Sequence, residues 1–388
     1  MNTGDYQDCW RPTAQQENLL RAALLRGQTA IRAWEEWKAS IDIENLDSGT
    51  YRLLPLLYKN MLAHEVSDPL VDRLKSVYRH TWSKNQMLLR AAAGLLGAMR
   101  ERRIETIALK GAALASLYYR DWGARQMSDF DLLVPTSKAR ETMSALQDLG
   151  WKPQTQWPER AILVRHSTDF SDSGGRSLDL HWHLMWECCR EDDDADFWQA
   201  ASPLLLGDEE TLALCSADQL LHVCVHGSMW NPNPPFRWAA DAMMIIQSSN
   251  VDWNRLLAQT ERRRLVLPVG RMLAWLRHSL DARVPDALIE EMQAIRVSRS
   301  ERVEYRVKMR QMKGLSSLAT FWFMQRRSSE GGLLRRLAEF PRYLQYNWGL
   351  ERLHQVPVYM ATRVARRNLR RMVSLFDRSL PKTRTASR

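Results

Sequence analysis

The sequence has no apolar run that approaches the roughly 20 residues needed for a membrane-spanning helix. The best candidate, residues 265–276, is short and is interrupted by Arg271. Residues 1–12 contain charged side chains and lack the apolar segment of a signal peptide. We therefore expect neither a transmembrane helix nor a signal peptide, and the sequence predicts a cytoplasmic protein.

Cysteine pairs of the kind that bind zinc or form a disulfide framework are also lacking. The chain has five cysteines and no C-x-x-C spacing; Cys188 and Cys189 are adjacent and the other three are scattered. An odd number without regular spacing argues against both a zinc knuckle and a disulfide-stapled fold. We expect reduced, buried thiols, as in cytoplasmic proteins.

The 388 residues are 45% apolar and 26% charged, which is ordinary for a globular protein and excludes a wholly disordered or collagen-like chain. The net charge of +10 is unevenly distributed. Residues 296–388 carry 22 Lys and Arg against 6 Asp and Glu, whereas residues 1–295 carry 33 against 39. The basic end predicts an anionic partner, either RNA or a membrane surface.

Residues 363–371 (RVARRNLRR) concentrate part of this charge on an expected amphipathic helix. The run fits a platform for RNA or for acidic lipid headgroups. It also fits a helix that packs its apolar side and leaves its arginines in water. The sequence leaves these interpretations open.

The spacing of apolar residues changes along the chain and divides it into regions. Three-and-four spacing predicts helices up to residue 103, and the chain is again helical from residue 216. Between them, short alternating runs predict strands, separated by two helices. The expected strands are 104–109, 129–134, 161–169 and 177–183, and the expected helices between them are 112–119 and 137–149. The sequence thus predicts an α+β fold in which a small mixed sheet is embedded between N- and C-terminal helical regions. The expected domains are 1–103, 104–200, 201–295 and the basic extension 296–388.

Three acidic residues are the strongest candidates for chemistry. Asp129 and Asp131 lie two apart on an expected strand, so both side chains point to one face, and Asp179 lies on a later strand. Three converging carboxylates repel one another, and burial disfavours their charge. A divalent cation removes that cost, and oxygen ligands suit Mg²⁺ or Mn²⁺. Such ions support phosphoryl or nucleotidyl transfer. A D-x-D pair alone is also common among solvated surface acids.

A glycine turn precedes the acidic strand. Lys110, Gly111 and Ala112 stand where an expected strand becomes a helix. Glycine lets backbone N–H groups approach an anion, and a helix N-terminus favours phosphate. Lys110 adds a positive charge. We expect these three residues to bind the phosphates of a nucleotide.

Other polar residues allow more than one role. Arg125 lies between the glycine and the D-x-D, where it can reach a triphosphate or remain solvated. His181 shares the Asp179 face and can bind phosphate, tune Asp179 or form an ordinary cross-strand hydrogen bond. The spacing of His222 and His226 fits two ligands on one helix face, but no third ligand follows, so we expect a packed helix. The residues 192–194, within the acidic run 191–196, predict a solvated loop.

Two segments carry a family resemblance. Residues 109–134 (LKGAALASLYYRDWGARQMSDFDLLV) and 177–182 (SLDLHW) resemble the signature of an uncharacterised nucleotidyltransferase family, part of the polymerase-beta-type nucleotidyltransferase superfamily. The similarity spans about residues 15–350. It implies a small nucleotidyltransferase palm between helical regions, in a bacterial protein.

The resemblance also implies roles for individual residues. Asp129 and Asp131 would be metal ligands, Asp179 would be the third carboxylate and help to activate an acceptor hydroxyl, and Gly111 would be the phosphate-loop glycine. The chain departs from the wider superfamily in placing Ala112 where serine or glycine is usual. The 18-residue interval between Gly111 and Asp129 is also longer than usual.

The sequence therefore predicts an ATP- or other NTP-binding, Mg²⁺-dependent nucleotidyltransferase. It would move a nucleoside monophosphate from an NTP to an acceptor hydroxyl and release pyrophosphate. The acceptor stays open among small molecules, glycan precursors, peptides and RNA. Two alternatives are a catalytically degenerate nucleotide-binding protein and an RNA-associated module that uses the basic C-terminal helices.

Overall fold

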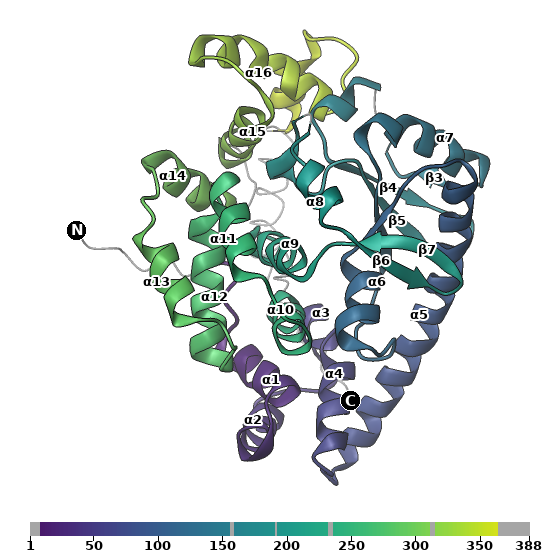
Figure 1. Ribbon diagram of the computed structural model, residues 1–388, viewed down its shortest axis with the longest axis vertical. Helices are drawn as coiled ribbons and strands as arrows, with labels where there is room; N and C mark the ends of the chain where they lie inside the picture. The colour runs from purple at the N-terminus through teal and green to yellow at the C-terminus, as the bar shows by residue number, and fades with distance from the viewer. Residues whose placement is uncertain (1–7, 156–158, 191, 232–235, 311–314, 364–388) are drawn as a thin grey trace, which may run out of the picture.

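The structure is a computed structural model that describes residues 8–155, 159–190, 192–231, 236–310 and 315–363. One seven-stranded mixed sheet lies among many helices, which confirms the α+β prediction (Figure 1). The strands are β1 (Ile107–Leu109), β2 (Asp129–Leu133), β3 (Lys152–Pro153), β4 (Ser167–Ser171), β5 (Ser177–His181), β6 (Ser202–Leu206) and β7 (Glu209–Ala213).

The helices fall before, within and after the sheet region. Before it lie α1 (Ala14–Leu24), α2 (Gly27–Ala39), α3 (Ser48–Tyr51), α4 (Leu54–Ala63) and α5 (Pro69–Glu101). Between the strands lie α6 (Lys110–Leu114), α7 (Ala139–Asp148) and α8 (Ala195–Gln199). After it lie α9 (Ser216–Ser228), α10 (Arg237–Ser248), α11 (Trp253–Arg262), α12 (Val266–Leu280), α13 (Asp286–Ala294), α14 (Arg299–Lys308), α15 (Leu315–Ser328) and α16 (Leu333–Asn347). Among the described helices, none has both the length and the hydrophobicity to cross a membrane.

The order of strands in the sheet is β3-β4-β5-β2-β1-β7-β6. The central strands β2 and β5 run parallel, and their register sets Asp131 beside Asp179. On the other side of β2, β1 runs antiparallel and sets Leu109 beside Asp131. Because side chains alternate along a strand, this register brings the two acids to one face of the sheet. The centre of the sheet therefore positions the candidate site.

Two parts of the sheet differ from the sequence prediction. The strand expected at 161–169 is instead a 3₁₀ turn, Glu159–Leu163, followed by β4. The register of β4 against β5 is set by the tight hairpin that joins them, where Gly175 has a φ of +74°. The hairpin β6–β7 joins the sheet beyond residue 200, where we expected the helical region to begin. Our four-domain division stays a prediction.

The long helix α5 covers the sheet. Asp68 caps its first turn by accepting the Leu70 N–H, and Pro69 opens the helix at a position where its missing N–H costs nothing. Leu95 and Leu96 of its buried face belong to the same apolar cluster as Leu206 of β6. In Figure 1, α5 runs along the right of the sheet, and α9 to α13 lie to its left.

Helices from both ends of the described chain share a second core. Residues of α1, α2 and α4 pack in one cluster with residues of α9 to α13. At its edge the rings of Trp10, Trp238 and Trp275 lie 5.6–6.4 Å apart, centroid to centroid. Aromatic contacts of this kind contribute beyond the area they bury. The N-terminal helices therefore close the core of the later helical region.

The contact between α9 and α10 depends on a glycine. A Cβ built on Gly227 would lie 2.5 Å from Cβ and Cγ of Trp238. We expect Gly227→Ala to lower the free energy of unfolding by about 1–3 kcal/mol, because α10 must shift. Gly94, exposed within α5, has no atom within 4 Å of such a Cβ. Gly94→Ala is the matched control and should raise stability by about 0.5–1 kcal/mol. Urea unfolding of both variants checks this; equal effects would contradict it.

Candidate functional site

The three predicted acids lie on the central strands. Asp131 of β2 is 3% exposed, and Asp179 lies directly beside it on β5. Asp129 stands two residues earlier on β2, on the same face, and its carboxylate accepts a hydrogen bond from Ser128 Oγ at 3.1 Å. The predicted convergence of Asp131 and Asp179 is thus present in the structure. Their roles as metal ligands stay a prediction.

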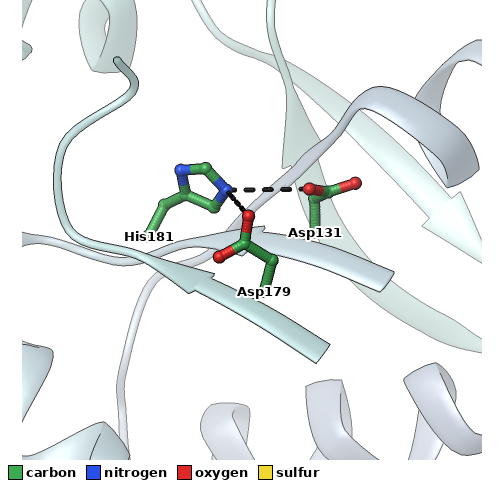
Figure 2. Close-up of side chains that lie close together, drawn as sticks. All are labelled: Asp131, Asp179 and His181. Carbon is green, nitrogen blue, oxygen red and sulfur yellow. Dashed lines mark hydrogen bonds and ion pairs between the residues drawn. The ribbon is translucent and has the colours of Figure 1, made fainter. Parts of the chain in front are cut away.

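His181 completes a group of three side chains whose ligand atoms all lie within 4.8 Å of one another. Its Nε2 atom is 2.8 Å from Asp179 Oδ2 and 3.6 Å from Asp131 Oδ1, as Figure 2 shows. The imidazole is 1% exposed. Strand periodicity gave the face of His181, but its contact with both carboxylates depends on the pairing of β2 with β5. This group can hold a metal ion.

A divalent cation fits the donor set. Asp179 Oδ1 is buried and has no hydrogen-bond partner among the described residues. A buried carboxylate oxygen without a donor is costly, and a cation supplies the missing interaction. The carboxylate oxygens suit Mg²⁺ and Mn²⁺, and the imidazole nitrogen can join them as a ligand only when His181 is neutral.

Lys110 also contacts this group, although we expected it to face a nucleotide's phosphates. Its Nζ atom lies 2.6 Å from Asp131 Oδ1 and 3.6 Å from Asp179 Oδ2. Its backbone φ is +39°, the left-handed region that non-glycine residues seldom adopt. Such strain costs about 1–3 kcal/mol and is typical of functional sites. Phosphate binding by Lys110 stays a prediction.

The glycine of the turn is constrained by packing. A Cβ on Gly111 would lie 3.0 Å from Met127 Sδ and 3.4 Å from Arg125 Nη1. Lys110 is thus the residue of this turn with a left-handed φ. Glycine is needed at 111 because neighbouring side chains occupy the space that a Cβ would fill. Ala112 is buried in the first turn of α6. Phosphate binding by this turn stays a prediction.

The charges of the site determine its protonation. Burial raises the pKa of Asp131, but Lys110 and His181 outweigh burial and lower that pKa to about 2. Burial likewise opposes the ionisation of Asp179, yet His181 and Lys110 hold its pKa below the ordinary value. Burial lowers the pKa of His181, but Asp179 raises it to about 9. Burial and the charge of Asp131 raise the pKa of Asp129. Two carboxylates therefore face two cations at neutral pH, while Asp129 gains most from a further cation.

Arg125 lies in a buried ion pair instead of a solvated or phosphate-facing position. Its guanidinium donates to both oxygens of Asp241 at 2.8 and 2.9 Å, and Tyr119 Oη donates to the same carboxylate. The side chain is 4% exposed. This pair joins the loop before β2 to α10. Because its guanidinium already has a protein partner, we do not include Arg125 in the proposed nucleotide site.

Residues 192–194 were expected to be solvated, and that expectation is wrong at Asp194. Asp194 is buried and accepts a hydrogen bond from the Leu184 N–H, while its other oxygen lies 2.7 Å from His183 Nδ1. Asp196 pairs with Arg263 at 2.8 Å. Asp194 meets groups 10 and 11 residues earlier in the chain, and Asp196 meets a side chain 67 residues later, so composition alone could not place them.

The histidine pair of α9 and the cysteines complete the candidate residues. His222 is buried and His226 is exposed on α9, and no ligand cluster in the described part of the chain includes either. All five cysteines are free thiols; Cys188, Cys189 and Cys224 are buried.

The family comparison agrees with the resemblance seen in the sequence. Residues 49–281, more than half of the chain, match an uncharacterised nucleotidyltransferase family. The chain belongs to this family. The match contains both segments that carry the resemblance, 109–134 and 177–182, so the family prediction is confirmed.

Similarity to solved structures is remote. The antibiotic-resistance factor ANT(2'')-Ia, known from a solution structure, is 13% identical, with 51% of this chain and 99% of that chain covered and a TM-score of 0.34. An antigenic nucleotidyltransferase-like protein from Paracoccidioides brasiliensis is also 13% identical, with 53% and 96% covered and a TM-score of 0.37. No curated protein matches the sequence.

Proposed function

We propose that this protein is a divalent-metal-dependent nucleotidyltransferase. It transfers a nucleoside monophosphate from an NTP to an acceptor hydroxyl and releases pyrophosphate. The observation that carries the proposal is the pairing of Asp131 with Asp179, with one carboxylate oxygen left without a donor, in a chain of the nucleotidyltransferase family.

Each side chain of the site has a role in this mechanism. Asp129, Asp131 and Asp179 hold Mg²⁺ or Mn²⁺, which neutralises charge on the reacting phosphates. Asp179 also accepts a hydrogen bond from the acceptor hydroxyl and orients it. His181 fixes the Asp179 carboxylate through the 2.8 Å contact. Lys110 adds a positive charge beside the phosphates, and backbone N–H groups of the Gly111–Ala112 turn donate to them.

One observation favours a second candidate, a nucleotide-binding protein without turnover. The Lys110 ammonium lies among the carboxylates, where it already satisfies part of their charge. Such a protein would bind an NTP and release no pyrophosphate. The RNA-associated alternative depends mainly on the run 363–371, of which only Arg363 lies within the described residues, so it stays a prediction.

Labelled nucleotides distinguish these functions. We expect purified protein, supplied with Mg²⁺ or Mn²⁺ and a cell extract, to transfer label from at least one α-labelled NTP to an acceptor. The same NTP labelled at the γ-phosphate should leave its label in pyrophosphate, because the bond between the α- and β-phosphates is the one that breaks. Removal of the metal with EDTA should abolish transfer. Nucleotide binding without transfer from any of the four NTPs would support the second candidate instead.

A further inference from the structure

The position of Lys110 follows from the pairing of the central strands. Leu109 ends β1 directly beside Asp131 of β2, so the next residue leaves the sheet at the acidic face. The left-handed φ of +39° turns the chain at this point. The side chain is 21% exposed, and its ammonium reaches one oxygen of Asp131 and one oxygen of Asp179. The backbone and the sheet register together hold a positive charge between two carboxylates.

That is the place where a two-metal site would hold one of its ions. Paired catalytic cations lie about 3.5–4 Å apart and share carboxylate ligands. Here the oxygens that face each other across β2 and β5, Asp131 Oδ1 and Asp179 Oδ2, already contact Lys110 Nζ and His181 Nε2. The buried Oδ1 of Asp179, in contrast, has no partner among the described residues. Lys110 and His181 thus occupy Asp131 Oδ1 and Asp179 Oδ2, whereas Asp179 Oδ1 is available to a metal ion.

The charge of the site agrees with a single ion. Asp129, Asp131 and Asp179 carry three negative charges when ionised, and Lys110 offsets one. A divalent cation placed between the oxygens that Lys110 contacts would lie against its ammonium, and this like-charge contact is costly in a largely buried site. Because Mg²⁺ is commonly bound by one or two carboxylates and the substrate phosphates, the single ion can enter with the triphosphate.

We propose that Lys110 takes the place of one catalytic metal ion, so that the site binds a single divalent cation together with its nucleotide. This inference rests on the proposed function for the identity of the nucleotide. It gives Lys110 a fixed place beside Asp131 and Asp179, and it predicts how many metal ions bind.

Electron paramagnetic resonance with Mn²⁺ tests the number of ions without requiring turnover. The full chain is saturated with Mn²⁺ and α,β-methylene-ATP, which cannot be cleaved between its α- and β-phosphates. In the wild-type protein we expect the spectrum of isolated Mn²⁺ ions only. Lys110→Met, which removes the charge and keeps the length, should gain a second ion and show the spectrum of a magnetically coupled pair. Lys110→Arg, which keeps the charge, is the matched control and should remain without a pair.

The outcomes separate this inference from the proposed function. A coupled pair in the wild-type protein would overturn the inference even if nucleotidyl transfer is observed. Single-ion binding without any transfer would support the inference while the proposed activity fails. A folded Lys110→Met protein, judged by circular dichroism, that gains no second ion would also overturn it. If that variant does not fold, the wild-type and Lys110→Arg spectra still decide: a pair in either contradicts the inference, and isolated ions in both support it.

Discussion

Asp131→Asn and Asp129→Ala should each lower the rate of nucleotidyl transfer by at least about 10³-fold. Metal ions stabilise the charge of the transition state by several kcal/mol, and each 1.4 kcal/mol corresponds to a factor of ten in rate. Asn keeps the shape of Asp131 but loses the charge that faces Lys110 at 2.6 Å. Ala removes the Asp129 carboxylate altogether. The measurement is the rate of label transfer from the preferred α-labelled NTP at saturating Mg²⁺.

A control at another acid of the same sheet separates the site from general charge effects. Asp208 is exposed in the turn between β6 and β7, at the far edge from β5. Asp208→Asn should leave the rate within about twofold, because surface substitutions away from special features have small effects. Circular dichroism confirms that each variant is folded. Metal-dependent turnover at the wild-type rate in Asp131→Asn or Asp129→Ala would remove that residue from the proposed ligand set.

Arg125→Met should lower the free energy of unfolding by about 3–5 kcal/mol, because it removes two hydrogen-bonded contacts of a buried carboxylate and leaves it only Arg237, at 4.0 Å, as a cationic neighbour. Burial raises the pKa of Asp241, but Arg125 outweighs burial and holds that pKa below the ordinary value. The pair therefore stabilises the fold above the ordinary carboxylate pKa, and this contribution is lost as the pH falls through the lowered one. Urea unfolding at neutral pH measures the loss.

Two further variants test the buried pair. The double variant Arg125→Met/Asp241→Asn removes both charges and keeps an acceptor for Tyr119 Oη, so it should recover much of the lost stability. Arg335→Met breaks the exposed pair with Glu339 and should cost less than about 1 kcal/mol. If Arg125→Met instead left stability unchanged and weakened nucleotide binding, Arg125 would contact the triphosphate as first expected.

Strand periodicity was enough to predict the acidic face of the site. Alternation places Asp129 and Asp131 on one side of β2, and the same rule places Asp179 and His181 together on β5. The family signature then gave these positions a shared chemistry. The face of each side chain and the family could be predicted because each depends on residues within one short segment or on a motif whose pattern is local, whereas the shared chemistry stays a prediction.

Contacts between segments that lie apart in the chain could not be predicted from local sequence patterns. The hairpin β6–β7 was not predicted, because residues 201–295 were assigned to a helical domain and its pairing with β1 involves residues about 100 positions away. The partner of Arg125 lies on α10, 116 residues later, and the partner of the His183 ring lies in a run that composition assigns to solvent. No local spacing encodes such partners.

The sequence by itself determined the fold class, the family and the side of the sheet on which the acids lie. Only the tertiary structure decided that Lys110 contacts the two carboxylates and that Arg125 pairs with Asp241. The physical reason is that a side chain's face follows from the local backbone, whereas its partner follows from which strands and helices pack together. Lys110 adopts a left-handed backbone conformation that is usual for glycine and rare for lysine. Strand pairing and packing can therefore override the local conformational preference of a residue.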